Sequence, residues 1–291
     1  MTASGTAGHG AELAPYFDLS SLGAFVVKSL AAFEWGGNPA PRVHPAGVGM
    51  INAVGLQGPG VQHWMADELP ALITTGARVV ASIWGRSVDD YRAAAEMLAA
   101  APVQVVAVEV NLSCPNLEGR RGIFAHDAAL SAEVIAATAG CGRPRWAKLS
   151  PNTDRVVEVA AAVHDAGAEA VTLVNTLLGM VLDPATGRPV LGAGGGGYSG
   201  RPVHPVAVRT VYDVHAALPS LPIIGTGGVA SGWDAAELML AGASAVQVGT
   251  ATFADPTAPV RVQRDLLSWC AQRGLAPADL TGLAHRGGLH H

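Results

Sequence analysis

Short apolar runs recur along the 291 residues of the chain, and each is followed by an Ala- and Leu-rich stretch with helical spacing. The runs are apolar at successive positions, which is typical of strands buried on both faces of a parallel sheet. The predicted strands are Ala24–Lys28, Val79–Ile83, Val105–Asn111, Arg145–Leu149, Ala170–Asn175, Pro222–Gly225 and Ala245–Gly249. The predicted helices lie near 60–74, 87–100, 127–139, 154–166, 203–217, 232–240 and 258–273. This repeat of strand and helix predicts an α/β fold.

A first strand that ends at Ala3 brings the count to about eight strand–helix units. That count and the chain length favour a single-domain (β/α)8 TIM barrel over a doubly wound sheet. No linker rich in Pro, Gly or Ser divides the sequence, so residues 1–291 are predicted to form one domain, with 275–291 as a tail. Polar and glycine residues follow the predicted strands, and in a barrel they lie at the C-terminal rim, where active sites are built. The pattern therefore predicts an enzyme.

The composition argues against several classes of protein. Hydrophobic residues make up 49% of the chain and charged residues 14%, so the chain can bury a core and is not disordered. Asp and Glu (23) outnumber Lys and Arg (18), which argues against nucleic-acid binding. The uncharged stretch Val214–Trp233 contains Pro219 and Pro222, which argues against a membrane span. The three cysteines have no CxxC spacing and the histidines have no metal-ligand spacing, so no metal site is predicted. The cysteine usage and a start unlike a signal peptide predict a cytoplasmic protein.

Two glycine loops follow the last two predicted strands. Gly225, Gly227 and Gly228 lie in the first loop, and Gly249 and Thr250 lie in the second. Glycine lets backbone N–H groups approach an anion closely, and the loops after strands 7 and 8 of such barrels commonly hold a phosphate. The alternative interpretation is a pair of tight turns without a ligand.

Cys114 differs from the other two cysteines. The apolar strand before it places Asn111 at the rim, and Cys114 follows on a loop that Pro115 keeps from becoming helical. A thiol in such a place can act as a base or a nucleophile when its pKa suits the reaction. The alternative is an inert buried thiol, which is the interpretation for Cys141 and Cys270.

Two lysines and one turn complete the candidate site. Lys28 and Lys148 each end an apolar strand, so both cations are predicted over the barrel mouth, where they suit a phosphate, an anionic substrate or a reduced flavin. The alternative is an ordinary surface lysine with its charge in water. Asn52 precedes the turn 53–56, whose N–H groups are suited to a nest for a carboxylate.

Nine motifs follow one another along the chain. They are ASGT (3–6), VKS (27–29), INAVGLQGPG (51–60), NLSCPN (111–116), AKLSPN (147–152), VNT (174–176), YSGRP (198–202), IIGTGGV (223–229) and VGTATFADP (248–256). Together they resemble the dihydroorotate dehydrogenases, over Met1 to about Leu267. The Cys of SCPN is the mark of the soluble class 1 enzymes. The run from 51 to 256 is most similar to the catalytic subunit of the NAD-linked, two-subunit branch.

The resemblance implies a flavoprotein oxidoreductase, an FMN-containing barrel that oxidises (S)-dihydroorotate to orotate in pyrimidine biosynthesis. Cys114 would take a proton from C5 while a hydride passes from C6 to flavin N5, and Pro115–His126 would form a lid. The substrate residues that it implies are Lys28, Asn52, Ala53, Val54, Gly55, Leu56, Asn111, Asn175 and Thr176. The FMN residues that it implies are Ser4, Lys28, Ser29, Asn111, Lys148, Val174, Gly200, Gly227, Gly228, Gly249 and Thr250.

The chain departs from the family pattern at three places. Only Met1 and Thr2 precede ASGT, where the family has a longer lead, so a shortened first strand is expected. Ser82 stands where the family often has an asparagine that touches FMN, and no role is transferred to it. In the lid, GIFAHD (122–127) replaces the commoner Gly-Thr-Asp pattern.

The resemblance also implies a homodimer, and a further subunit with FAD and an iron–sulfur cluster if NAD is the electron acceptor. This sequence has neither a cysteine cluster nor a Rossmann fingerprint, so transfer of electrons to NAD would need that subunit. The alternative is that fumarate or another oxidant reaches the flavin directly. Two other functions stay open. One is a related flavin barrel that acts on a dihydropyrimidine base or on dihydrouridine in tRNA, against which the carboxylate-type turn 53–56 argues. The other is a non-catalytic flavin- or phosphate-binding barrel, against which Cys114 argues.

Overall fold

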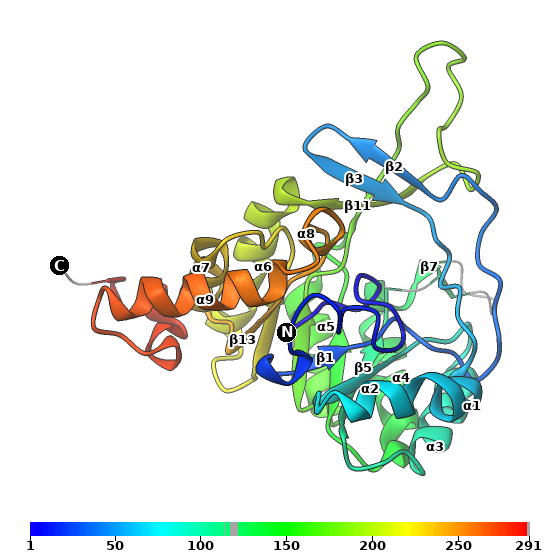
Figure 1. The fold of residues 1–291 in the computed structure, drawn as a ribbon, viewed down its shortest axis with the longest axis horizontal. Helices are drawn as coiled ribbons and strands as arrows, with labels where there is room; N and C mark the ends of the chain where they lie inside the picture. The colour runs from blue at the N-terminus through cyan, green and yellow to red at the C-terminus, as the bar shows by residue number, and fades with distance from the viewer. Residues whose placement is uncertain (114, 117–121, 290–291) are drawn as a thin grey trace.

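Seven parallel strands form one curled sheet at the centre of the molecule (Figure 1). The computed structural model describes residues 1–113, 115–116 and 122–289. Along the sheet the strands keep their order in the chain. They are β1 (Phe25–Val26), β4 (Val79–Ile83), β5 (Val105–Asn111), β8 (Arg145–Lys148), β9 (Ala170–Leu173), β12 (Ile223–Thr226) and β13 (Ala245–Gln247).

The first three residues occupy the remaining position of the barrel, between β13 and β1. Ala3 donates its backbone N–H to the carbonyl of Val248 at 2.9 Å, and Val248 donates to the carbonyl of Met1 at 2.9 Å. On the other side, the Thr2 hydroxyl accepts from the N–H of Val26 at 2.8 Å and donates to its carbonyl at 3.2 Å. A side chain joins the two segments at this seam in place of a backbone ladder. The sheet thus closes, and the predicted α/β barrel of the TIM type is confirmed.

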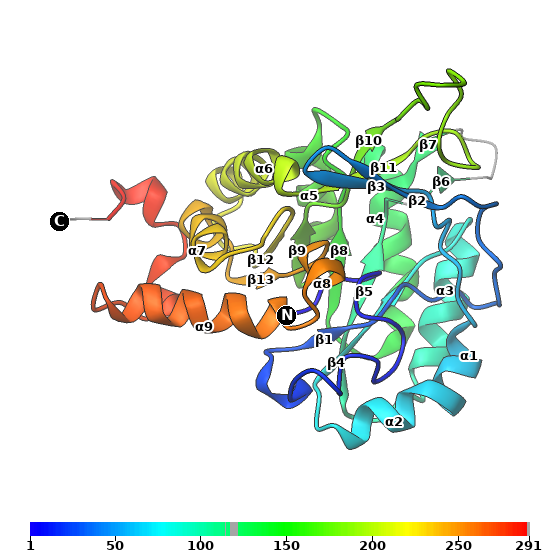
Figure 2. The same ribbon diagram turned by 45° about the horizontal axis from the view of Figure 1, so that its top comes forward.

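Helices follow the strands and cover the outside of the barrel (Figures 1 and 2). Between β1 and β4, one continuous element runs through a π-helical turn in its middle. Its parts are α1 (Val61–His63), η2 (Trp64–Glu68) and α2 (Leu69–Thr74). The other helices are α3 (Val88–Leu98), α4 (Ala128–Ala137), α5 (Val156–Asp165), α6 (His204–Ala217), α7 (Gly232–Ala241), α8 (Ala251–Ala254) and α9 (Ala258–Ala271).

Local sequence signals start several of these helices. Ser87 caps α3 by accepting from the N–H of Asp90 at 3.1 Å, and Asp127 caps α4 in the same way. Ser231 and Asp234 form a reciprocal capping box at α7. Each cap satisfies an N–H group that has no partner within the helix, and its loss typically costs about 1 kcal/mol. These ends can therefore be read from the sequence.

Large aromatic side chains fill the core between the strands and the helices. Trp64, Tyr91, Phe25 and Phe124 are fully buried. The rings of Tyr91 and Phe124 meet edge to face with their centroids 5.4 Å apart. Tyr91 also donates its hydroxyl to the carbonyl of Asn111 at 2.6 Å. Core packing is thus connected directly to the rim end of β5.

A second, antiparallel sheet lies over the carboxyl ends of the barrel strands (Figures 1 and 2). Its order is β10 (Leu177–Gly179), β11 (Gly196–Gly200), β3 (Gly49–Asn52) and β2 (Val43–Ala46). Separately, β6 (Pro115–Asn116) pairs with β7 (Gly122–Ile123) in antiparallel fashion. The sequence does not predict the second sheet, because three of the five residues of β11 are glycine and its partners are distant in the chain.

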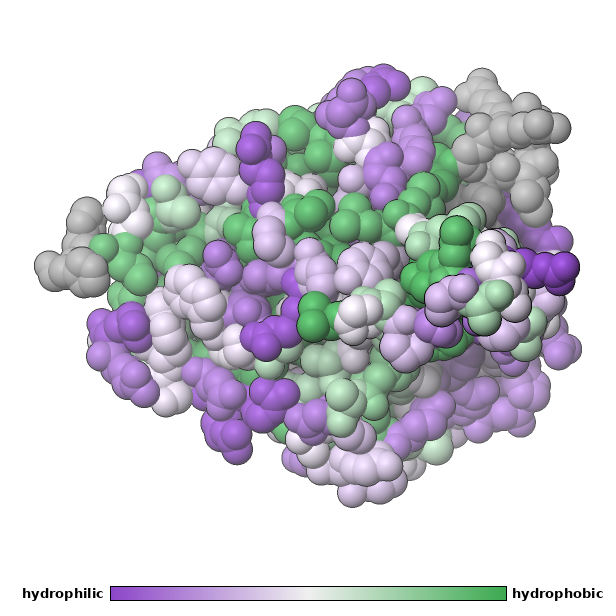
Figure 3. All heavy atoms as spheres, turned by 90° about the horizontal axis from the view of Figure 1, so that it is seen from above, coloured by the Kyte–Doolittle hydropathy of each residue, from purple (hydrophilic) through white to green (hydrophobic). Residues whose placement is uncertain are grey.

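The predicted strands Val79–Ile83 and Val105–Asn111 coincide with β4 and β5, and the other predicted elements differ by no more than two residues at either end. The segment from 275, predicted as a tail, contains η6 (Pro277–Leu280) and η7 (Leu283–Arg286). Leu280 is fully buried there and belongs to a small apolar cluster with Cys270. In the described part of the chain, no helix has the length and apolarity needed to cross a membrane. Seen from above, the surface carries apolar patches among hydrophilic residues (Figure 3).

Candidate active site

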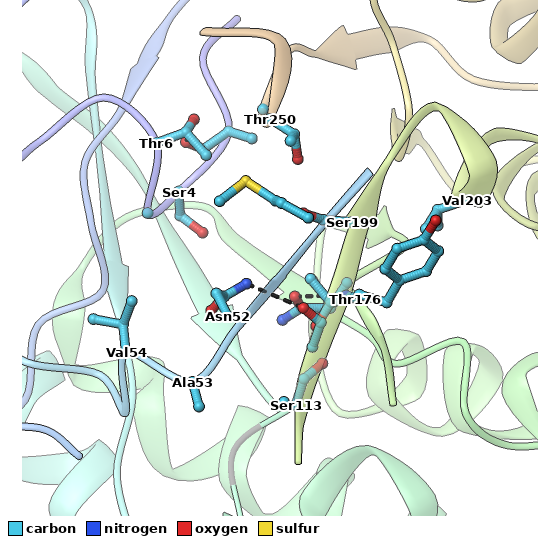
Figure 4. A pocket seen from close by; sticks show the side chains of 18 of the residues that line it. Ser4, Thr6, Asn52, Ala53, Val54, Ser113, Thr176, Ser199, Val203 and Thr250 are labelled. Atoms are coloured by element: carbon cyan, nitrogen blue, oxygen red, sulfur yellow. Dashed lines mark hydrogen bonds between the residues drawn. The ribbon is translucent and has the colours of Figure 1, made fainter. Parts of the chain in front are cut away.

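A cavity of about 420 Å³ opens at the carboxyl ends of the barrel strands, beneath the second sheet. Such a volume is typical of small-molecule sites. All the site residues predicted from the sequence that fall within the described ranges line it. They are Ser4, Lys28, Ser29, Asn52, Ala53, Val54, Gly55, Leu56, Asn111, Lys148, Val174, Asn175, Thr176, Gly200, Gly227, Gly228, Gly249 and Thr250. Figure 4 shows that Ser4, Asn52 and Thr250, from distant parts of the chain, lie around one space. Their individual roles remain predictions.

The charge of the cavity wall has one sign. Among the described residues, Lys28 and Lys148 are the only charged side chains that line it, and no acidic side chain does. Lys148 is 4% exposed and donates to the hydroxyl of Ser4 at 3.0 Å. Charges interact more strongly where water is largely excluded, so a wall that carries two lysines and no acidic side chain among its described residues favours an anionic ligand.

The loop after β12 runs very close to α6. Gly227 and Gly228 have φ of +127° and +70°, which side chains other than glycine rarely adopt. A Cβ at Gly227 would lie 2.8 Å from the Cβ of Ala207, and one at Gly228 would lie 2.7 Å from the Cβ of His204. Glycine is therefore required here. We call Gly227, Gly228, Gly249 and Thr250 the glycine cradle.

His204, which the sequence analysis does not single out, supports this cradle from behind. Its Nδ1 lies 2.9 Å from the carbonyl oxygen of Gly227, and its Nε2 lies 3.1 Å from a carboxylate oxygen of Glu237. Because a carbonyl oxygen only accepts, Nδ1 must carry the proton in the first contact. In a trans peptide the C=O and the following N–H point in opposite directions. His204 thus directs the N–H of Gly228 away from α6, toward the cavity that Gly228 lines.

Hydrogen bonds to its carbonyl groups hold the turn 53–56 in place. The backbone N–H of Asn38 donates to the carbonyl of Val54 at 3.1 Å, and its side-chain amide donates to that of Ala53 at 3.2 Å. The indole N–H of Trp35 donates to the carbonyl of Gly55 at 2.9 Å. Three successive carbonyl groups are therefore bound on the side of segment 35–38.

The N–H groups of residues 54–56 consequently point the opposite way. They make no backbone hydrogen bond within the described ranges. Gly55 and Leu56 have φ of +73° and +63°, and a positive φ at leucine is a strained conformation that a structure keeps only where other contacts enforce it. Residues 54–56 also line the cavity. We call them the carboxylate nest, because successive N–H groups of this kind bind anions.

Amide side chains connect neighbouring strands at the rim. Asn175 donates to the side-chain oxygen of Asn111 at 3.3 Å, and Asn111 donates to the hydroxyl of Ser29 at 3.4 Å. The hydroxyls of Ser29 and Ser82 lie 2.8 Å apart. Ser82 is fully buried behind Ser29 and is not part of the cavity wall. Its contact to Ser29 is a supporting one.

Two features of the cavity have no counterpart in the prediction from the sequence. The glycine-rich run GAGGGG (192–197) leads into β11, where Gly196 and Gly197 line the cavity. Asn52 donates to the carbonyl of Gly197 at 3.3 Å, and a Cβ at Gly197 would collide with Thr176. Glu109 is fully buried below the cavity wall. Two sequence signals could have pointed to these features. They are the high density of glycine in GAGGGG and the single charged residue in the apolar run VVAVEVN.

Cys114, the predicted base, and residues 117–121 of the predicted lid lie outside the described residues. Ser113 and Ile123 on either side line the cavity. The Ser113 hydroxyl is buried and has no hydrogen-bond partner within the described ranges. The roles of Cys114 and of the lid therefore stay predictions.

The other two cysteines are buried free thiols. Burial raises the pKa of the Cys270 thiol, which disfavours the reactive thiolate. In the described ranges, no group of three or more His, Cys, Asp or Glu residues is arranged to hold a metal ion.

Comparisons with known proteins concern the chain as a whole. The sequence model of the family described as dihydroorotate dehydrogenase matches residues 1–269. The chain is 45% identical, over 99% of its length and 94% of the relative's, to the dihydroorotate dehydrogenase B (NAD(+)) catalytic subunit of Desulforudis audaxviator. It is 43% identical to the protein of the same name from Trichlorobacter lovleyi, over 95% of this chain and 90% of that one. It is also 43% identical to a putative dihydroorotate dehydrogenase A (fumarate) of Solibacter usitatus, over 97% and 93% of the two chains. The chain belongs to the dihydroorotate dehydrogenase family.

Proposed function

We propose that this protein is an FMN-dependent, class 1 dihydroorotate dehydrogenase that oxidises (S)-dihydroorotate to orotate in pyrimidine biosynthesis. One observation carries the proposal: a single cavity joins a glycine cradle, a carboxylate nest and two lysines, with no acidic side chain among its described residues. The cradle suits the phosphate of FMN and the nest suits the carboxylate of dihydroorotate. Family membership supports both assignments.

The residues at one end of the cavity fit FMN. The cradle leaves no room for a Cβ at Gly227 or Gly228, so the backbone itself forms the wall that would receive the phosphate. Around the rest of the group we place Ser4, Lys28, Ser29, Asn111, Lys148, Val174 and Gly200. When bound, FMN supplies the acceptor for the hydride that leaves C6 of the substrate.

The other end of the cavity fits the substrate. The N–H groups of the carboxylate nest would bind its carboxylate, and Lys28 would add a positive charge. Asn52, Asn111, Asn175 and Thr176 offer amide and hydroxyl groups for the pyrimidine ring. Since Asn111 and Asn175 are hydrogen-bonded to each other, both are held in place before a ligand arrives.

Cys114 is the proposed general base. It follows Ser113, which lines the cavity, and as a thiolate it would accept the proton that leaves C5. Loss of this proton and of the hydride from C6 leaves the C5–C6 double bond of orotate, so the step balances. The segment Pro115–His126 is the proposed lid, which would exclude water from the site.

Purified protein tests the proposal directly. We expect it to hold about one FMN per chain and to lose its yellow colour when mixed anaerobically with dihydroorotate. Dihydrouracil, which lacks the carboxylate, serves as the matched control and should reduce the flavin far more slowly. Protein without FMN, or equal rates with both compounds, would contradict the proposal and favour a non-catalytic barrel or an enzyme for free bases.

We further propose a homodimer in the cytoplasm, working with a second subunit that holds FAD and an iron–sulfur cluster and passes electrons to NAD. Two similar proteins are named catalytic subunits of an NAD-linked enzyme, whereas another is named for fumarate. Around the second sheet, large apolar side chains are exposed, among them Val48, Leu178, Met180 and Leu182. Such a surface favours association. Copurification of an untagged flavin and iron–sulfur protein from the native host is the expected result, and turnover with fumarate by this chain alone would contradict it.

A further inference from the structure

The acidic residue Glu109 lies inside the barrel, below the cavity wall. Glu109 is on β5 and is fully buried. It is two residues before Asn111, so both side chains are on the same side of the strand, and Asn111 lines the cavity. The position of Glu109 is thus one layer deeper in the barrel than the proposed site.

The two carboxylate oxygens of Glu109 have different surroundings. Oε2 accepts from the hydroxyl of Thr172 at 3.1 Å and from the side-chain amide of Gln247 at 2.8 Å. Oε1 makes no hydrogen bond within the described part of the chain. It lies 3.5 Å from Nζ of Lys148, whose ammonium group also donates to Ser4 in the cavity. Neutral donors hold one oxygen, and the other faces the cation.

Charge balance explains this arrangement. A buried carboxylate is strongly disfavoured unless a charge or several hydrogen bonds compensate it. Lys148 supplies that charge from the neighbouring strand β8, and both side chains are almost completely excluded from water. Lys148 is the member of the pair that lines the cavity. A ligand above it therefore meets an ammonium ion whose charge is partly neutralised from below.

We propose that Glu109 is a positioning residue, which fixes the Lys148 ammonium ion in the cavity wall and moderates the charge that bound FMN experiences. This rests on the proposed function. Reduced FMN carries more negative charge than oxidised FMN, so an unmoderated cation would stabilise the reduced form. Glu109 thus keeps the reduction potential of FMN lower than Lys148 alone would set it.

The substitution Glu109→Gln tests this, because it removes the charge and keeps the shape. It should favour binding of reduced over oxidised FMN by about tenfold, which for a two-electron couple raises the midpoint potential by about 30 mV. Lys148→Met should lower the potential. Thr172→Val, which removes one hydrogen bond and keeps both charges, is the matched control and should leave the potential close to that of the wild type. Spectroelectrochemical titration of bound FMN measures all of these without turnover.

The double variant Glu109→Gln/Lys148→Met shows whether Glu109 acts through Lys148. Without the lysine, Glu109 has no ammonium ion to fix or to neutralise, so its replacement should no longer change the potential. The double variant should match Lys148→Met, and it should fold even if Glu109→Gln alone does not, because no unbalanced charge remains. If the double variant fails to fold where Lys148→Met folds, Glu109 serves only the fold and the proposal is overturned.

The outcomes separate this proposal from the proposed function. Wild-type protein that binds no FMN would overturn both. FMN-loaded wild type with an unchanged potential in folded Glu109→Gln would overturn only the role of Glu109. An equal shift of the potential by Glu109→Gln in the presence and in the absence of Lys148 would likewise overturn only the proposed role of Glu109.

Discussion

The glycine cradle and the carboxylate nest present the same chemical group, the backbone N–H, by two different means. The cradle is formed by close packing, since Gly227 and Gly228 lie so near α6 that neither has room for a Cβ. The nest is formed by hydrogen bonds, since Asn38 and Trp35 hold the carbonyl groups of the turn on the opposite side. A packed site tolerates no added atom, whereas a hydrogen-bonded turn loses stability one contact at a time. The two ends of the cavity should therefore respond differently to substitution.

Gly228→Val should have the largest effect and should abolish FMN binding. Its Cβ would meet the Cβ of His204 at 2.7 Å, so the loop must move away from α6. Bound FMN per folded chain after gel filtration measures this. Gly23→Ala is the matched control, because its Cβ would have no neighbour nearer than 3.8 Å. A Gly228→Val protein with full FMN content would refute the placement of the phosphate.

Cys114→Ala should remove the chemistry and leave both anion sites intact. We expect the rate of flavin reduction by dihydroorotate to fall by about 10²–10⁴-fold, the usual contribution of a positioned base. Affinity for FMN and orotate should hardly change. Rapid mixing under anaerobic conditions isolates this half-reaction, and Cys114→Ser should retain some activity that rises with pH. Reduction of Cys114→Ala at the wild-type rate would mean that another group is the base.

Trp35→Phe should weaken orotate binding at the carboxylate nest moderately. It removes the indole N–H that binds the Gly55 carbonyl at 2.9 Å. One neutral hydrogen bond is worth about 0.5–1.5 kcal/mol, so the Kd for orotate should rise by about two- to tenfold while FMN binding is unchanged. Trp269→Phe, on α9, is the control and should alter neither. Equal losses of orotate and FMN would show that the two sites are not independent.

His204→Phe tests whether the cradle also depends on a hydrogen bond. Loss of the contact from Nδ1 to the Gly227 carbonyl should weaken FMN binding by about two- to fivefold, because packing still holds the loop. His204→Asn, whose amide can donate from a similar position, should restore most of the affinity. Isothermal titration of the protein without FMN provides the Kd values. Loss of all binding in His204→Phe would mean that the cradle is no less dependent on hydrogen bonds than the nest.

The smallest predicted effect is on the pH dependence of the free energy of unfolding, through His9. Burial, followed by the nearby charge of Lys28, lowers the pKa of His9 from 6.5 to about 4. Between these values the unfolded chain binds a proton that the folded protein does not, so the free energy of unfolding falls as the pH falls through this window. Burial raises the pKa of Glu68, which acts in the opposite direction and moderates the slope. Denaturant titrations across the window should show a shallower slope for His9→Gln; an unchanged slope would contradict the assignment.

The sequence alone determines the barrel and the residues of its rim. Apolar runs such as Val79–Ile83 and capped starts such as Ser87 are local signals, so strands and helices follow from neighbours in the chain. Parallel strands in a barrel have their carboxyl ends on one side, which is why residues as distant as Ser4 and Thr250 could be predicted to meet.

Only the tertiary structure shows which groups support the site. Asn52 meets Gly197, His204 meets Gly227, and Glu109 meets Lys148 across gaps in the chain that no periodicity bridges. The second sheet is equally non-local, because Tyr198 is the only residue of β11 of a type that favours strands, and the strand is defined by its partners. Backbone direction in the nest likewise depends on the carbonyl contacts of Asn38 and Trp35. Residue type thus specifies which chemistry is available, and the packing of distant segments decides where each charge and each N–H group points.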